Sequence, residues 1–418
     1  DSEIIDEVRD RLDNGRDKNC PISPSKFNAY FGLYSSASKV VSTPNYCVIP
    51  DYENKCKVKV NYVTETSEDE DDIIDIREIE LPFNRTDGMG LINYERSKLW
   101  AEELGLDYVP AEWCIRQSFI KGMLATFPIQ EFCEKIGGGR YETTDVYGNK
   151  VDLRNIDIIL TESQFKLWNA YPNLEYYNEC CEKNNLKWGA AIHTPKKDND
   201  ILKLNYQFLQ TLNLSDEDID KVTQMFVDWI KGISFEDMDY LKLFLLGGRH
   251  DEKSIQNYMR SSDNYWIKCL ILEPQLINDK FIRQKVYNLI KNRIQRGCLG
   301  EIIVNGNFQV IVSDPYAMMQ HTLGMEVTGL LKEKEYYSNY WNEKGVKVVD
   351  SMRAPMTYLS EHVKLTLRDD EDVNYWYRYL TSGVILNYFG HETMNYAGSD
   401  KSMSPRLVIN DEKNVVNL

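Results

Sequence analysis

Four short blocks of the chain each place a charged residue beside an expected β-turn or strand, and their order limits the folds open to the sequence. They are Asp87 to Gly90, Cys114 to Gly122, Ser163 to Lys166 and Met352 to Pro355, and a fifth block, Ala397 to Asp400, follows near the end. Taken singly, each has an ordinary explanation, because a lysine among apolar residues commonly reaches the surface from a strand. The series therefore carries more information than any one block.

Composition sets the outer bounds. A chain of 418 residues is long enough for two or three domains with a buried core. Its net charge of −16 argues against a protein that coats nucleic acid through a broad basic surface, although a local basic channel stays open. Part of the acidity is concentrated in the run 68–72, which is typical of a solvated loop.

No apolar run approaches the roughly 20 residues that a membrane helix needs, so no membrane partner is expected. The nine cysteines include no Cys-x-x-Cys pair, and none of the five histidines lies at ligand spacing from a cysteine pair, which disfavours a structural zinc site. Scattered thiols are typical of a reducing cytoplasm. The chain also begins without Met, which favours a processed chain or a fragment.

Composition divides the chain into four regions. They are an N-terminal segment 1–80, a strand-rich region 81–210, a helical region 211–296, and a second strand-rich region 297–418 that contains a helical insertion. In the second region the run 137–140, Gly-Gly-Gly-Arg, fits either a flexible loop or a cradle for a phosphate. In the last region 301–312 predicts a hairpin with its turn at Asn305-Gly306, and 373–389 predicts a helix.

Two helices are predicted in the third region. The first begins at Ser215, an expected N-cap with Asp218 three residues on, and ends at Gly232. The second, 280–296, is the most basic segment of the chain. A solvated face with cations near the helix C-terminus and a contact to a nucleic-acid backbone both fit this segment.

The order and spacing of the blocks resemble the catalytic core of the two-barrel RNA polymerases. This family includes the RNA-silencing RNA-dependent RNA polymerases and the RNA polymerases of gut (crAss-like) bacteriophages. The resemblance implies an α+β fold in which two double-psi β-barrels, at 81–210 and 297–418, are joined by the helical connector 211–296. It also implies template-directed RNA synthesis, in which a 3′-hydroxyl attacks the α-phosphate of a ribonucleoside triphosphate and pyrophosphate leaves.

By the same resemblance, Lys121 and Lys166 are the catalytic lysines of the first barrel. Arg353 and Arg116 bind substrate, and Asp400 is the first metal-binding aspartate of a Mg²⁺ site. The implied partners are a nucleic-acid template, the nascent RNA, ribonucleoside triphosphates and further polypeptide segments of a larger polymerase. A phage-encoded protein of the host cytoplasm or the virion is the implied setting.

One departure follows Asp400. The family places aspartates at alternate positions, Asp-x-Asp-Gly-Asp, whereas Asp400 is followed by Lys401, Ser402, Met403 and Ser404. Serine hydroxyls do not replace carboxylates as strong ligands of Mg²⁺. Two explanations stay open: a degenerate barrel without activity, which binds nucleic acid or scaffolds a larger complex, or a chain in which Asp400 is joined to residues from further along the natural protein. Another phosphoryl-transfer enzyme, such as a nuclease, would need a second carboxylate cluster.

Overall fold

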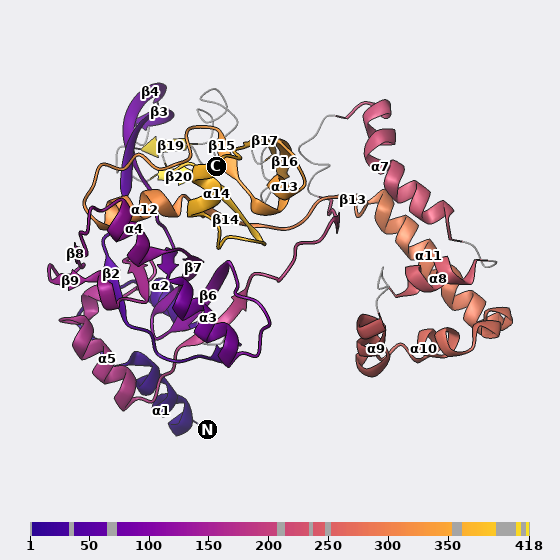
Figure 1. Cartoon of the computed structure of the whole chain (residues 1–418), viewed down its shortest axis with the longest axis horizontal. Coiled ribbons are helices and arrows are strands. Elements are labelled where there is room, and N and C mark those ends of the chain that lie inside the picture. Colours follow the sequence, from indigo (N-terminus) through magenta and orange to yellow (C-terminus); the bar gives the residue numbers. More distant parts are fainter. Residues whose placement is uncertain are drawn as a thin grey trace. The chain divides into compact units, whose positions relative to one another are not determined.

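The computed structural model describes residues 2–32, 37–64, 73–206, 214–233, 237–246, 252–352, 362–389, 407–410 and 415–417. The chain divides into two compact units, whose elements are labelled in Figure 1. The major unit comprises Asp1–Asp198, Phe308–Arg353 and Ser360–Leu418, and the helical unit comprises Asn199–Asn307 and Ala354–Leu359. Helices alongside several sheets confirm the expected α+β class.

A seven-stranded mixed sheet is the centre of the first half of the major unit, residues 1–198, with the strand order β1-β11-β6-β7-β5-β10-β2. Its strands are β1 (Lys39–Val40), β2 (Tyr46–Ile49), β5 (Met89–Ile92), β6 (Glu112–Gln117), β7 (Ile120–Thr126), β10 (Ile158–Thr161) and β11 (Gly189–His193). Every residue of β2, β5 and β10 is buried. Strands that are covered on both faces need continuous apolar runs, and these three strands have them.

Helices and short turns surround this sheet. They are α1 (Ser2–Asp13), α2 (Pro24–Gly32), α3 (Tyr94–Glu103), α4 (Ile129–Lys135) and α5 (Leu174–Lys183), with the 3-10 turns η2 (Leu153–Asn155) and η3 (Trp168–Ala170). A small hairpin adds β8 (Glu142–Thr144) and β9 (Lys150–Asp152). The side chains of Asn93 and Asn173 accept hydrogen bonds from the first turns of α3 and α5, which satisfies backbone donors that a helix start leaves free.

The glycine run after α4 is the end of that helix. The N–H groups of Gly137 and Gly139 donate to the carbonyl oxygens of Phe132 and Cys133 at 2.9 and 3.0 Å, and Gly139 has a φ of 77°. Such bonds satisfy the last carbonyls of a helix and need the left-handed conformation that glycine adopts. They occupy two of the amides that a phosphate cradle would use, which favours the loop interpretation.

The second half of the major unit, residues 308–389, contains a five-stranded sheet in the order β14-β18-β15-β17-β16. Its elements are β14 (Val310–Ser313), α12 (Pro315–Thr322), β15 (Glu335–Tyr337), α13 (Asn339–Glu343), β16 (Val348–Met352), β17 (His362–Leu367), α14 (Glu371–Trp376) and β18 (Val384–Asn387). One apolar cluster includes Leu91 and Ile159 of the first half with Val312, Met318 and Leu386 of the second. The two halves therefore share a core.

A third sheet of the major unit joins a long hairpin to the end of the chain, in the order β20-β19-β3-β4. Its strands are β3 (Glu53–Thr64), β4 (Ile73–Asn84), β19 (Leu407–Asn410) and β20 (Val415–Asn417). Strand β19 pairs in parallel with β3, so a strand near the end of the sequence lies beside one from its first 65 residues.

The helical unit consists of α7 (Asp216–Lys231), α8 (Met238–Leu245), α9 (Glu252–Ser261), α10 (Tyr265–Leu272), η4 (Pro274–Asn278) and α11 (Lys280–Cys298), with the strand pair β12 (Ile201–Lys203) and β13 (Ile303–Asn305). The predicted capping box between Ser215 and Asp218 is confirmed. Leu241, Leu270 and Val286 are fully buried in the core of the unit. Within the described part of the chain, no helix is both long and apolar enough to cross a membrane.

Two local predictions in the last region are wrong. Residues 301–312 do not form a hairpin, because β13 pairs with β12 while β14 pairs with β18. The predicted helix 373–389 ends at Trp376, and residues 384–387 form the buried strand β18. In both cases partners distant in sequence outweigh the local signal, since a short apolar run does not distinguish a buried strand from a helix.

Candidate functional site

Three of the sequence blocks meet at the side chain of Gln164. Its amide nitrogen donates to the carbonyl oxygens of Gly88 at 3.2 Å and Met123 at 2.9 Å. A side chain at Gly90 or Gly122 would collide with this glutamine. The glycines of two blocks thus leave the space that the glutamine of a third block fills. Sequence reasoning noted the blocks but not this contact, for which a single sequence gives no signal.

A second set of hydrogen bonds holds the same turns together through Asp51. Its carboxylate accepts from the hydroxyls of Thr86 at 2.8 Å and Ser163 at 2.9 Å, and from the Ser163 N–H at 3.1 Å. The N–H of Gly88 in turn donates to the Ser163 hydroxyl at 3.0 Å. Burial, and then the nearby Asp51 carboxylate, raise the pKa of Glu162. Asp51 was not predicted, since it lies outside every block.

The predicted basic residues of the first half lie together. Arg116 and Lys121 are direct partners across the antiparallel strands β6 and β7. The Lys166 N–H donates to the Phe119 carbonyl at 2.9 Å, one residue from the antiparallel bridge between Ile120 and Phe165. This pairing places the backbone of Lys166 beside β7, the strand that carries Lys121, with Ile120 and Phe165 opposite each other across the bridge. Both of those apolar side chains are fully buried.

The charges of these three residues are not neutralised locally. Among the described residues, no carboxylate lies within the 4.0 Å ion-pair distance of Arg116, Lys121 or Lys166. Arg116 donates from Nη1 to the Ile115 carbonyl at 2.7 Å and to Cys114 Sγ at 3.2 Å, while its buried Nε has no hydrogen-bond partner. A buried donor without a partner is uncommon in proteins. The three side chains therefore leave positive charge that no described carboxylate neutralises.

The other two predicted site residues, Arg353 and Asp400, lie outside the described residues. Arg353 directly follows β16, whose last residue, Met352, pairs with His362 of β17. No group of three or more His, Cys, Asp or Glu side chains that could hold a metal ion occurs in the part of the chain that the structure describes.

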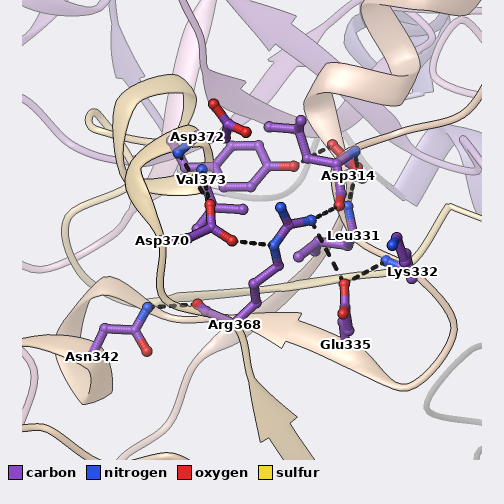
Figure 2. A network of polar contacts seen from close by, with 11 residues as sticks. Asp314, Leu331, Lys332, Glu335, Asn342, Arg368, Asp370, Asp372 and Val373 are labelled. Carbon is purple, nitrogen blue, oxygen red and sulfur yellow. Dashed lines mark hydrogen bonds and ion pairs between the residues drawn. The ribbon is translucent and has the colours of Figure 1, made fainter.

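The second half uses its charges internally (Figure 2). Asp314 is fully buried, which raises its pKa, while hydrogen bonds from Tyr377 and from backbone N–H groups oppose the shift. It accepts from the Tyr377 hydroxyl and the Leu330 N–H, both at 2.7 Å, and from the first turn of α12. Arg368 lies beside this network and bonds the Asp370 carboxylate at 2.5 Å. These contacts fix the loop after α12 to the sheet.

A cleft of about 940 Å³ lies elsewhere in the major unit. Its walls come from Ile49–Pro50, from 140–144, from 150–152 with Arg154, and from 321–324. Its cations include Lys150 and Arg154, which pair with Glu142 at 3.0 Å and Asp152 at 2.9 Å. Neither Lys121 nor Lys166 lines this cleft, so it is separate from these lysines.

Comparison with known proteins identifies a phage RNA polymerase as a relative of this chain. No family model matches the chain. The chain is 26% identical over 401 residues to the DNA-directed RNA polymerase YonO of Bacillus phage SPbeta, a match that covers 93% of this chain and 43% of that protein. A solved RNA-dependent RNA polymerase, QDE-1 from Thielavia terrestris, is 14% identical with a TM-score of 0.46, over 74% of this chain and 31% of the other.

The chain is homologous to the phage RNA polymerase, and the resemblance to RNA polymerases that its sequence blocks indicate is confirmed. It spans less than half the length of that relative.

Proposed function

We propose that this chain carries the catalytic region of a template-directed RNA polymerase that transfers nucleotides from ribonucleoside triphosphates to a growing RNA. The observation that supports the proposal is that Arg116, Lys121 and Lys166 lie on paired segments of the first half, in a chain that aligns with a phage RNA polymerase over 93% of its length. In this proposal 81–210 and 297–418 form two double-psi β-barrels, 211–296 connects them, and the protein acts in the cytoplasm of a phage host.

The three cations suit the charge of this reaction. A triphosphate brings several negative charges, and more charge develops on its oxygens as the bond to pyrophosphate breaks. Preorganised cations that meet this charge lower the barrier, because they need no rearrangement during the reaction. In this proposal Lys121 and Lys166 contact the nucleotide and the RNA end, Arg116 supports the same charges from the adjacent strand, and Arg353 approaches from the second barrel.

Magnesium is the cofactor that the resemblance implies, and it would supply charge to both the attacking and the leaving oxygens. The residues of this chain do not provide the expected site. Asp400 is followed by Lys401 and Ser402, so one carboxylate stands where the family has three. A hard divalent cation prefers several oxygen ligands, with carboxylates among them. Asp400 is therefore the one residue of this chain that we propose as a ligand of the metal.

The same departure favours a second candidate function. A barrel protein that has lost its aspartates would bind nucleic acid, or scaffold a larger complex, without synthesising RNA. This alternative keeps Arg116, Lys121 and Lys166 as contacts for phosphate groups. It predicts binding of a primer–template without incorporation of nucleotides.

The test is incorporation of labelled ribonucleotides by the full chain on a primed template, with Mg²⁺ and separately with Mn²⁺. Template-dependent product that Lys121→Ala removes supports the polymerase. Lys98→Ala is the matched control, because Lys98 is an exposed lysine of the neighbouring helix α3. Binding without product supports the scaffold alternative, and the absence of both would contradict the two candidates together.

A further inference from the structure

Helix α11 of the helical unit carries six cations and no carboxylate along its length, in a chain with a net charge of −16. The cations are Lys280, Arg283, Lys285, Lys291, Arg293 and Arg296. They are distributed from the first turn of the helix to its last turn. A solvated helix usually intersperses both signs of charge, because pairs three or four residues apart stabilise it.

The stability of the helix explains only the cations of its last turn, where the dipole favours them and Arg296 pairs with Glu301 at 3.5 Å. Lys280 occupies the first helical position and Arg283 the next turn, where the positive end of the helix dipole disfavours cations. Arg293 and Arg296 are three residues apart, so their like charges repel each other. Cations spread in this way cost the isolated helix free energy, and a bound polyanion would remove that cost.

Helix α7 of the same unit shows the usual arrangement. Its first turn carries Asp216, Glu217 and Asp218, and its last turn carries Lys231. Glu217 and Lys221 form an ion pair of 2.7 Å at the i,i+4 spacing. One unit thus contains a helix whose first turn carries carboxylates, as the dipole favours, and another whose first turn carries cations instead.

The cations of α11 are available at the surface. Ile282 and Val286 point into the core of the helical unit, whereas Lys280, Lys285 and Lys291 are exposed. In the described ranges none of these three lysines has a carboxylate within 4.0 Å. At 1.5 Å per residue, Lys280 and Lys291 lie about 16 Å apart along the helix axis.

Two aromatic side chains accompany these lysines. Phe281 is 60% exposed and Tyr287 is 55% exposed. The Lys285 ammonium lies 5.2 Å from the centre of the Phe281 ring. Exposed aromatic rings between cations are typical of surfaces that hold a polynucleotide, since rings contact bases or sugars while cations contact phosphates.

We infer that the exposed face of α11 marked by Lys280, Lys285 and Lys291 binds the phosphate backbone of a nucleic acid. The inference rests on the proposed function, because a polymerase must hold its template and product. A duplex carries one negative charge per about 1.7 Å of its axis, so the distance of about 16 Å from Lys280 to Lys291, which lie about three turns apart on one side of α11, spans several phosphates. Lys285 lies on the adjoining side of the helix. Contacts of this kind hold the nucleic acid without reading its sequence.

The test uses the full chain and a labelled primer–template of mixed sequence. The variant Lys280→Gln/Lys285→Gln/Lys291→Gln is compared with Lys221→Gln/Lys231→Gln/Lys242→Gln, which removes the same charge from α7 and α8 of the same unit. Affinity is measured by fluorescence anisotropy at several salt concentrations. A third variant, with arginine at positions 280, 285 and 291, restores the charge, and circular dichroism checks that each variant keeps its helices.

Each lost phosphate contact reduces the magnitude of the slope of log affinity against log salt by about one. For the α11 variant, which loses three lysines, this magnitude should therefore fall by up to about three. The control should keep the wild-type slope, and the arginine variant should restore it. Equal slopes for the α11 variant and the control, or no binding by the wild type at low salt, would overturn the inference. Incorporation assays are separate: binding that depends on α11 without RNA synthesis keeps this inference and rejects the polymerase proposal.

Discussion

Two sets of charged side chains in the major unit, one in each β-rich half, have opposite surroundings. In the first half, Lys121 and Lys166 lie on neighbouring segments with no carboxylate within 4.0 Å among the described residues. In the second half, the fully buried Asp314 accepts hydrogen bonds from three separate segments, and Arg368 pairs with Asp370 at 2.5 Å. Lys121 and Lys166 leave charge available to a ligand, whereas Asp314, like Asp51 of the first half, uses its charge to hold neighbouring loops together.

This difference separates function from stability in a way that mutations can measure. An exposed lysine without a partner contributes little to folding, so its loss should affect ligand binding or turnover alone. A buried carboxylate with several hydrogen bonds contributes to folding, because its removal leaves donors without partners. The two halves should therefore respond differently to the same kind of substitution.

The largest expected effect is on RNA synthesis. In a natural chain that carries the complete aspartate cluster after Asp400, Asp400→Ala should abolish incorporation, since a metal site does not tolerate the loss of a direct ligand. Lys121→Ala should lower turnover by about 100-fold or more, in line with other groups that meet transition-state charge. Incorporation kinetics and thermal unfolding, measured together, check this prediction.

Unchanged turnover of Lys121→Ala would place the chemistry elsewhere in the molecule. Robust synthesis that survives Asp400→Ala would show that Asp400 is wrongly assigned to the metal. Lys98→Ala should leave both turnover and unfolding unchanged, because Lys98 is an exposed residue of α3.

What the sequence predicted well is local. The capping box of α7 needs only Ser215 and Asp218, three residues apart, and the structure contains it. The order of the blocks assigns Lys121 and Lys166 to one site, which stays a prediction; the structure places their segments next to each other. The contact that holds these segments, between Gln164 and two glycine positions, depends on strands distant in sequence and has no local signature.

The errors have the same cause. The Asn305-Gly306 pair favours a hairpin turn, yet the strands on either side of it pair with residues about 100 positions upstream and 75 positions downstream. Residues 384–387 are apolar at every position and fit a buried strand as well as a buried helix. Partners distant in the chain decide both cases.

The next effect in size concerns Asp314 in the second half. Asp314→Ala should lower the free energy of unfolding by roughly 3–5 kcal/mol, because the Tyr377 hydroxyl and several backbone N–H groups lose their acceptor inside the core. Equilibrium urea unfolding, followed by tryptophan fluorescence, measures the change. The matched control is Asp369→Ala.

Asp369 also forms an ion pair, with Lys347 at 2.7 Å, but this pair lies at the surface. Surface pairs contribute about 0–1 kcal/mol, so the control should change little. If the two variants lose similar stability, burial of the Asp314 network does not distinguish the second half, and the comparison between the halves fails.

The smallest effect concerns Glu112, a buried carboxyl of the first half that is 3% exposed. Burial raises its pKa from 4.5 to about 7. Below pH 4.5 the folded and unfolded states both hold the proton, so the group has no effect on stability. Between pH 4.5 and 7 the unfolded chain releases the proton while the folded chain keeps it, and stability falls as the pH rises, by at most about 3 kcal/mol.

Glu112→Gln removes this titration, so the variant should gain stability relative to the wild type as the pH rises from 5 to 7.5. Urea unfolding at several pH values measures the difference, and Glu102→Gln, on the exposed side of α3, is the control that should follow the wild type. Parallel pH profiles for wild type and Glu112→Gln would show that Glu112 ionises in the folded state as it does in water. A rising difference would instead show that the first half excludes an unpaired charge from its core while presenting Lys121 and Lys166 at its surface.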